Sequence, residues 1–271
     1  HCDLKPENIL FVSHRRCIVK VIDFGSSCFL SDHLSSYIQS RSYRAPEVIL
    51  GADYDGRIDV WSLGAILVEL ITGDVLFSSE TVPEMLARIS AVCGQPFPRA
   101  LLWEGRHTQD FFTKFGAIYE MGNKEGNDNA EDSIYVYYPE NRSAKSHVGG
   151  NQQPNSSTES SSSSRHDGER EEPQQQKDGP FSYLRRKLAR HHVDDTLLID
   201  FIEKCLVLDH KARPTSAELL RHPFLLETSQ SSPQAPAGEG RKLILFVFSC
   251  WRRDVFFRHN PQHCSFGVIF R

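Results

Sequence analysis

Four polar side chains near the start of the chain are of the types that phosphate chemistry uses. The stretch HCDLKPEN carries Asp3, Lys5 and Asn8, and Asp23 follows in the stretch IDFG. A carboxylate can accept or orient the proton of an attacking hydroxyl, and an ammonium group can stabilise charge on a moving phosphoryl group. Asn and Asp oxygens are hard ligands of the kind that Mg²⁺ prefers. The set is typical of phosphoryl transfer, although each residue alone would also be explained as a turn former.

A predicted β-hairpin places these residues. Residues 8 to 23 contain two short apolar runs, NILFV and CIVKVID, which are separated by the polar stretch SHRR. Runs rich in β-branched and aromatic residues on either side of a polar turn are typical of a hairpin. Asn8 then comes just before the first strand, and Asp23 arrives at the end of the neighbouring one.

Helix signals follow the hairpin. The segment from Asp59 to Thr72 is apolar nearly all round and stops at Gly73, which predicts a buried helix with a glycine cap. Thr81 and Glu84 indicate a capping box at the start of a further helix that Gly94 ends. Two more helices are expected at 195–207 and 216–221, the second with a Thr215/Glu218 capping signature.

Composition divides the chain into four parts. Residues 1–121 and 181–226 have the apolar patterning of a folded domain. Between them, 122–180 is rich in Ser, Gln and Asn and buries too little apolar surface to offset its ordering entropy, so we predict a disordered insertion. Residues 227–271 are expected to be a linker followed by a tail to which we assign no role.

Overall composition bears on partners and compartment. The formal net charge of −4 provides no general basic field, so neither nucleic acid nor a membrane is an expected partner. No apolar stretch long enough to span a bilayer and no signal-peptide pattern is visible. The seven cysteines are scattered and never spaced as CxxC, which fits a reducing compartment. We therefore expect a cytoplasmic or nuclear protein, or one present in both compartments.

Five ordered motifs resemble the C-terminal lobe of eukaryotic protein kinases. They are HCDLKPENIL, DFG, APE at 45–47, DVWSLG at 59–64 and KARP at 211–214. The sequence HCD, together with DFGSSCF and SYIQSRSYRAPEVILG, resembles the corresponding stretches of the dual-specificity tyrosine-regulated kinases (the DYRK family). Within that family, SRSYRAPEVILG is most similar to plant-like members.

The resemblance implies a role for each polar residue of the first paragraph. Asp3 corresponds to the catalytic base, and Lys5 to the residue that contacts the γ-phosphate of ATP. Asn8 and Asp23 correspond to the ligands of magnesium, so ATP and Mg²⁺ are the expected cofactors. Lysine at position 5 also favours serine or threonine hydroxyls of protein substrates. His1 and Phe24 correspond to apolar residues that support this site.

The family carries a YxY motif in the activation segment whose tyrosine is autophosphorylated. Here the corresponding stretch reads Ser35-Ser36-Tyr37, so Tyr37 is the expected phosphorylation site. Arg41 and Arg44 lie close enough in sequence to pair with a phosphate group. Tyr37 could instead be a packed aromatic residue beside two solvated arginines.

Two further contacts are implied by the resemblance. Ser40 occupies the position where kinases place a Ser or Thr that bonds the catalytic aspartate, here Asp3. Glu47 of APE and Arg213 of KARP are expected to form a buried ion pair that ties the activation segment to the last helices.

These observations predict a mainly α-helical fold with one small β-hairpin. We expect a kinase-like C-terminal lobe with the N-terminal lobe absent, because no GxGxxGxV or VAIK pattern occurs in the sequence. On that basis residues 1–271 are expected to be a fragment of a protein serine/threonine (dual-specificity) kinase and to be inactive alone, although the family is enzymatic. Two alternatives remain: an inactive pseudokinase or protein-binding module, and a small-molecule phosphotransferase of the aminoglycoside-kinase type.

Overall fold

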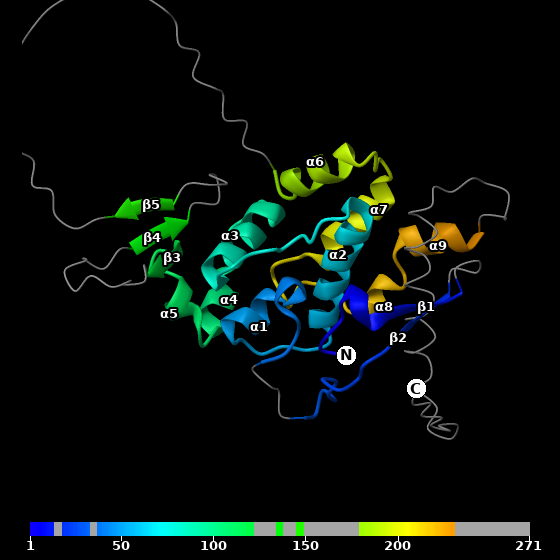
Figure 1. The fold of residues 1–271 in the computed structure, drawn as a ribbon, viewed down its shortest axis with the longest axis horizontal. Coiled ribbons are helices and arrows are strands. Elements are labelled where there is room, and N and C mark those ends of the chain that lie inside the picture. The colour runs from blue at the N-terminus through cyan, green and yellow to red at the C-terminus, as the bar shows by residue number, and fades with distance from the viewer. Residues whose placement is uncertain (14–17, 33–36, 122–133, 138–144, 149–178, 231–271) are drawn as a thin grey trace, which may run out of the picture.

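The computed structural model describes residues 1–13, 18–32, 37–121, 134–137, 145–148 and 179–230 (Figure 1). Two short 3₁₀ helices, at Pro6–Asn8 and Arg41–Tyr43, border the candidate site. In chain order, the helices and strands are β1 (Ile9–Ser13), β2 (Ile18–Val21), α1 (Pro46–Leu50), α2 (Arg57–Thr72), α3 (Val82–Cys93), α4 (Arg99–Glu104), α5 (Thr108–Phe111), β3 (Ile118–Met121), β4 (Ile134–Tyr137), β5 (Lys145–Val148), α6 (Ser182–Arg190), α7 (Thr196–Cys205), α8 (Ser216–Leu219) and α9 (Pro223–Gln230).

The hairpin forms from strands β1 and β2, as predicted. The strands are antiparallel, with Ile9 opposite Val21, and the register shifts by a bulge between Phe11 and Ser13. Val19 is buried against the helical body. Beyond the strand pair, the Ile22 amide donates to the Asn8 carbonyl at 2.9 Å. This last bond brings the residues that follow β2 beside the residues that precede β1.

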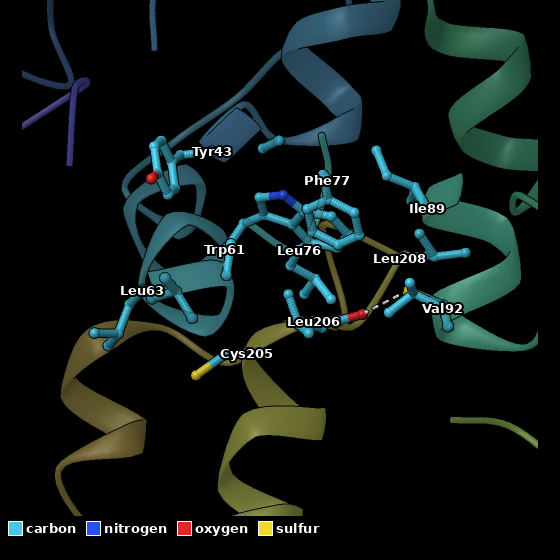
Figure 2. Packing of buried hydrophobic residues seen from close by; sticks show 14 of the residues in the cluster. Tyr43, Trp61, Leu63, Leu76, Phe77, Ile89, Val92, Cys205, Leu206 and Leu208 are labelled. Atoms are coloured by element: carbon cyan, nitrogen blue, oxygen red, sulfur yellow. Dashed lines mark hydrogen bonds between the residues drawn. The ribbon is translucent and has the colours of Figure 1, made fainter. Parts of the chain in front are cut away.

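Helix α2 forms the centre of the core. Its residues from Val60 to Val68 are all buried, and the helix ends at Gly73, which adopts a left-handed conformation with φ of 75°. Trp61 stacks on Phe77 with ring centroids 5.4 Å apart (Figure 2). A Cβ atom at Gly64 would lie 2.8 Å from Cys205 Cβ, so only glycine permits α2 and α7 to pack this closely.

The predicted helix caps are present in part. Asp195 caps α7, and its carboxylate accepts from the amides of Leu197 and Leu198. Thr215 and Glu218 form the complete capping box expected for α8. At α3 only half of the box is present. Thr81 accepts from the amide of Glu84, but the Glu84 carboxylate accepts from the amide of Glu80 instead of returning to that of Thr81. The preceding turn brings the Glu80 amide within reach, which sequence spacing does not show.

A second sheet was not predicted. Strands β3, β4 and β5 form an antiparallel sheet in that order, on the opposite side of the helical body from the hairpin in Figure 1. The expectation of a single hairpin is therefore wrong. Strand β4 forms antiparallel pairs with Ile118–Met121 on one side and with Lys145–Val148 on the other. Strands β4 and β5 lie within the segment 122–180 that we predicted to be disordered. The rest of that segment, and the tail beyond residue 230, lie outside the described residues, so the domain boundaries stay a prediction.

Among the residues that the structure describes, none of the helices is long and apolar enough to cross a bilayer. The cysteines of the described ranges, Cys2, Cys28, Cys93 and Cys205, are free thiols. Cys93 donates a hydrogen bond to the Leu206 carbonyl at 3.5 Å, which links α3 to the end of α7.

Candidate active site

Asp3, Lys5 and Ser40 form one hydrogen-bonded cluster. Ser40 donates twice to Oδ1 of Asp3, through its hydroxyl at 2.8 Å and its amide at 2.9 Å. The Lys5 ammonium lies 2.9 Å from Oδ2 of the same carboxylate and donates to the Ser40 hydroxyl at 3.1 Å. The structure thus brings Ser40 to Asp3 across 37 residues of sequence. Both oxygens of the carboxylate are held in place.

The cluster fixes the charge state of Asp3. Burial by itself raises the pKa of this carboxyl, but the hydrogen bonds from Lys5 and Ser40 outweigh burial and hold the pKa below its usual value. The hydrogen bond to Asp3 likewise raises the pKa of Lys5. At neutral pH the site therefore holds a carboxylate beside an ammonium group.

Asn8 and Asp23 lie at the same end of the hairpin. The Asn8 side chain is buried, and its Nδ2 donates to the Asp3 carbonyl at 2.9 Å. With the nitrogen engaged in this way, the amide oxygen is the atom left for a ligand. Asp23 is exposed and has a left-handed backbone with φ of 62°, and its Oδ1 accepts from the Gly25 amide at 3.2 Å.

These two oxygen donors fit magnesium in its usual phosphate-bound form. Mg²⁺ in such sites takes one or two protein oxygens and completes its shell with phosphate oxygens and water. Within the described ranges no group of three or more His, Cys, Asp or Glu side chains could hold a metal ion by itself. A site built from Asn8 and Asp23 would therefore depend on the phosphates of a bound nucleotide.

Asp59 of α2 anchors His1 and Cys2, the residues directly before Asp3. Its carboxylate accepts from the main-chain nitrogens of His1 and Cys2. The His1 ring bonds the Ile22 carbonyl at 3.0 Å and contacts the ring of Phe24 edge-on at 5.0 Å. The loop that carries Asp3 and the segment that carries Asp23 are thereby both tied to the central helix.

Cys2 directly precedes Asp3, and its surroundings keep its thiol uncharged. The side chain is buried, and its Sγ lies 3.6 Å from Cys28 Sγ. Burial is the main cause that raises the pKa of Cys2 to about 11. The thiol stays protonated at neutral pH, so an activation-segment phosphate would need its positive partners elsewhere.

Tyr37 is 83% exposed, and the guanidinium carbon of Arg44 lies 5.0 Å from the centre of its ring. Arg44 also donates to the carbonyls of Ile38 and Gln39. Arg41, in contrast, donates to the Glu80 carbonyl at 2.6 Å, in the turn before α3. The structure therefore brings Arg44 to Tyr37, whereas Arg41 is held by another segment.

Glu47 and Arg213 form a buried ion pair. Arg213 donates from Nη1 to Oε1 of Glu47 at 2.6 Å and from Nη2 to Oε2 at 3.0 Å, and both side chains are almost completely buried. Its guanidinium also lies 5.0 Å from the ring of Trp61. The pair joins α1 to the loop before α8.

Sequence reasoning missed one residue of the site. Gln39 precedes Ser40, is 5% exposed and has φ of 64°. Cys2 and Asp23 have the same left-handed backbone, which is uncommon for residues other than glycine, so three such residues gather around the cluster. No sequence pattern indicates a buried glutamine here, because its partners come from other segments.

The fold and the site together define a protein kinase. A family model described as "Protein kinase domain" matches residues 1–225. The chain therefore belongs to the protein kinase family. This membership argues against the small-molecule phosphotransferase alternative.

Curated relatives place the chain near one group of kinases. It is 37% identical over 234 residues to dual specificity tyrosine-phosphorylation-regulated kinase 3 of Rattus norvegicus, which covers 86% of this chain and 33% of the relative. It is 35% identical to the putative homolog of that kinase from Drosophila melanogaster, over 89% of this chain and 25% of the relative. It is 34% identical to dual specificity tyrosine-phosphorylation-regulated kinase 4 of Homo sapiens, over 94% of this chain and 39% of the relative. The chain is DYRK-like, and it spans about a third of the length of these relatives.

The family match corrects our prediction of the fold class. We predicted a C-terminal lobe alone, with the N-terminal lobe absent. The kinase-domain match begins at residue 1 and continues to residue 225, so the prediction of a C-lobe-only fold is wrong. It relied on motifs that all belong to one lobe. Such motifs identify the site, but they do not show which of the other residues belong to the kinase domain.

Proposed function

We propose that this protein transfers the γ-phosphoryl group of ATP to serine or threonine hydroxyls of protein substrates. The observation that carries the proposal is the Asp3–Lys5–Ser40 cluster, with Asn8 and Asp23 beside it at the end of the hairpin. A fixed carboxylate, a fixed cation and two oxygen donors are the parts that phosphoryl transfer needs, because this chemistry depends on positioning and electrostatics.

Each residue of the cluster has a distinct task in this proposal. Asp3 orients the substrate hydroxyl and accepts its proton, and Ser40 holds the carboxylate in that orientation. Lys5, whose Nζ lies 2.9 Å from the carboxylate, places positive charge where the phosphoryl group meets the hydroxyl. Asn8 and Asp23 would hold magnesium, which neutralises charge on the nucleotide phosphates when it is bound.

A phosphorylation assay tests the proposal. Residues 1–271 and the protein as its gene encodes it, called the full-length protein below, are each incubated with Mg²⁺, ATP and a generic basic protein substrate, and Asp23→Ala serves as the control. Incorporation of phosphate on serine or threonine that is lost in the Asp23→Ala variant supports the proposal. Folded full-length protein that transfers no phosphate would overturn it and favour the pseudokinase or binding-module alternative. We predicted that residues 1–271 are inactive because we expected the N-terminal lobe to be absent, and that expectation has been corrected. The same assay measures the activity of residues 1–271 directly.

We further propose that Tyr37 is autophosphorylated and that Arg44 holds the phosphate. The support is the exposure of Tyr37 and the position of Arg44 against its ring. Tyr37→Phe should lower the activity of the matured enzyme by about tenfold or more, because a hydrogen bond to a charged group contributes about 1.5 to 3 kcal/mol. Mass spectrometry of the expressed protein should find phosphate on Tyr37. Tyr119→Phe is the matched control for the activity measurement and should keep wild-type activity. Full activity of Tyr37→Phe would contradict this role.

The dual-specificity character, the plant-like subgroup and the cytoplasmic or nuclear location stay predictions. Phosphotyrosine in the expressed protein would test the first. Microscopy of a fluorescent fusion of the full-length protein would test the location.

A further inference from the structure

Gln39 is a buried polar residue that lies in sequence between Tyr37, the proposed phosphorylation site, and Ser40 of the Asp3–Lys5–Ser40 cluster. Its Nε2 donates to the Ile58 carbonyl at 3.1 Å and to the Ser62 hydroxyl at 2.8 Å, both on α2. Its Oε1 accepts from the Ala45 amide at 2.9 Å, at the start of α1. Both ends of the side-chain amide are thus engaged, and they join the segment to two helices.

The main chain of Gln39 is fixed as firmly as its side chain. Its amide donates to the Cys2 carbonyl at 3.0 Å, directly before Asp3 in sequence. Its carbonyl accepts from Arg44 Nη2 at 2.8 Å. The next amide in the chain, that of Ser40, donates to Asp3. The peptide unit between Gln39 and Ser40 is therefore held at its carbonyl by Arg44 and at its amide by Asp3.

This arrangement requires a backbone that glutamine does not favour. Gln39 adopts φ of 64°, a conformation that residues with a Cβ atom rarely take. Such a conformation persists only where surrounding contacts over-determine it. The side-chain bonds to α2 and α1 supply contacts of this kind, and they hold the Ser40 amide pointing at Asp3.

We propose that Gln39 is a positioning residue of the phosphoryl-transfer site: its buried amide anchors the segment to α2, so that Ser40 presents its amide and hydroxyl to Asp3. The inference rests on the proposed function, and it adds a residue that acts through Ser40. The side-chain hydrogen bonds of Gln39 go to α2 and to the start of α1, so it acts on Asp3 through Ser40.

The test replaces the amide by an apolar side chain of similar length. Gln39→Met in the full-length protein should lower kcat by about 10- to 100-fold, because small displacements of catalytic groups have effects of that order. The KM values for ATP and for a peptide substrate should stay within about threefold. Gln109→Met, the same change at an exposed position of α5, is the matched control and should keep wild-type kinetics.

Three further variants separate positioning from folding and strain. Ser62→Ala removes only one partner of the amide and should lower kcat in the same direction by less. Gln39→Gly relieves the backbone strain but removes the amide, so it too should lose kcat; wild-type kcat in this variant would show that the side chain is not needed. In the background of Ser40→Ala, Gln39→Met should cause a smaller additional loss than in the wild type, because the hydroxyl bond to Asp3 is already absent and only the bond from the Ser40 amide is left to displace.

A second readout does not depend on activity. Hydrogen exchange of the Ser40 amide, followed by nitrogen-15 NMR, should be faster in Gln39→Met than in the wild type and in Gln109→Met, because the Ser40 amide is then no longer held against Asp3. If the wild-type protein proves inactive, the proposed function fails, and this exchange rate still decides on positioning. An unchanged exchange rate, wild-type kcat, a loss confined to KM, or a loss explained by unfolded protein would each overturn the inference.

Discussion

The ion pairs Asp3–Lys5 and Glu47–Arg213 differ in their exposure to water. This difference explains why we assign catalysis to the first and stability to the second. The side chains of Asp3 and Lys5 are 16% and 25% exposed, and Ser40 shares the contact. Glu47 and Arg213 are 1% and 0% exposed and make two hydrogen bonds to each other inside the core. An ion pair that water reaches can exchange partners and take part in chemistry. A pair sealed from water is committed to the structure.

The same difference extends to the regions around each pair. The buried pair lies against Trp61, whose ring stacks on Phe77 at the centre of the apolar core. The open pair is surrounded by left-handed residues, Cys2 and Asp23 among them, and by loops. Among the described residues, three of the five non-glycine residues with positive φ lie around the proposed site, where contacts with α2 and its neighbours hold them in this conformation.

Breaking the buried pair should produce the largest effect on stability. Glu47→Ala leaves Arg213 charged and buried without its partner, which should lower the free energy of unfolding by about 3 to 5 kcal/mol. Urea unfolding measures the change. The double variant Glu47→Ala with Arg213→Met should be less destabilised than the sum of the two single variants. A loss below about 1 kcal/mol in Glu47→Ala would mean that the pair does not hold the segments together.

Breaking the open pair should affect catalysis instead. Lys5→Met should lower kcat by about 10²- to 10³-fold, which corresponds to roughly 2.7 to 4 kcal/mol of lost transition-state stabilisation. Its free energy of unfolding should change by about 1 kcal/mol or less, because partly exposed pairs contribute little. Steady-state kinetics and urea unfolding of the same preparation give both numbers. A large stability loss with normal kcat would reverse the comparison.

The core around the buried pair should tolerate no added volume. Gly64→Ala would place a Cβ atom 2.8 Å from Cys205 Cβ and should destabilise the protein by about 1 to 3 kcal/mol. At Gly56, where a Cβ atom would meet nothing within 4 Å, alanine should have little effect. Thermal unfolding compares the two variants. Equal melting temperatures would show that α2 and α7 are free to move apart.

The smallest expected effect is in the pH dependence of stability. The pKa of Asp3 is lowered in the folded state, so its contribution to stability is fully present above the unfolded value of about 3.9 and is lost as the pH falls through the folded value. The difference in unfolding free energy between the wild type and Asp3→Asn should therefore shrink below about pH 4. A difference that stays constant from pH 6 to pH 3 would contradict the bonding described for Asp3.

Local signals in the sequence predicted much of this arrangement. The buried helix, its end at Gly73 and the capping box at Thr215 depend on residues close together in the chain, and such patterns can be read directly. Long-range contacts between common partners, such as Ser40 with Asp3, could be expected only through the resemblance to kinases.

Other features depend on contacts that no local pattern contains. Gln39 is buried because atoms of α1, α2 and the catalytic loop surround it, and a glutamine in a polar segment gives no sign of this. Arg41 was expected beside Tyr37 by spacing, but the carbonyl of Glu80 holds it elsewhere. Strand β4 has the sequence IYVY, which is apolar and aromatic, but pairing with β3 and β5 decides that it joins a sheet.

One measurement tests the central claim most directly, namely that the open pair performs chemistry while the buried pair maintains the fold. Asp3→Asn and Glu47→Gln are prepared in the full-length protein, and the phosphoryl-transfer rate with Mg²⁺ and ATP is measured beside the free energy of unfolding. The account predicts that Asp3→Asn loses about 10²- to 10⁴-fold in rate while unfolding within about 1 kcal/mol of the wild type, whereas Glu47→Gln loses mainly stability. A wild-type rate in Asp3→Asn, or a stability loss in it as large as in Glu47→Gln, would contradict the account.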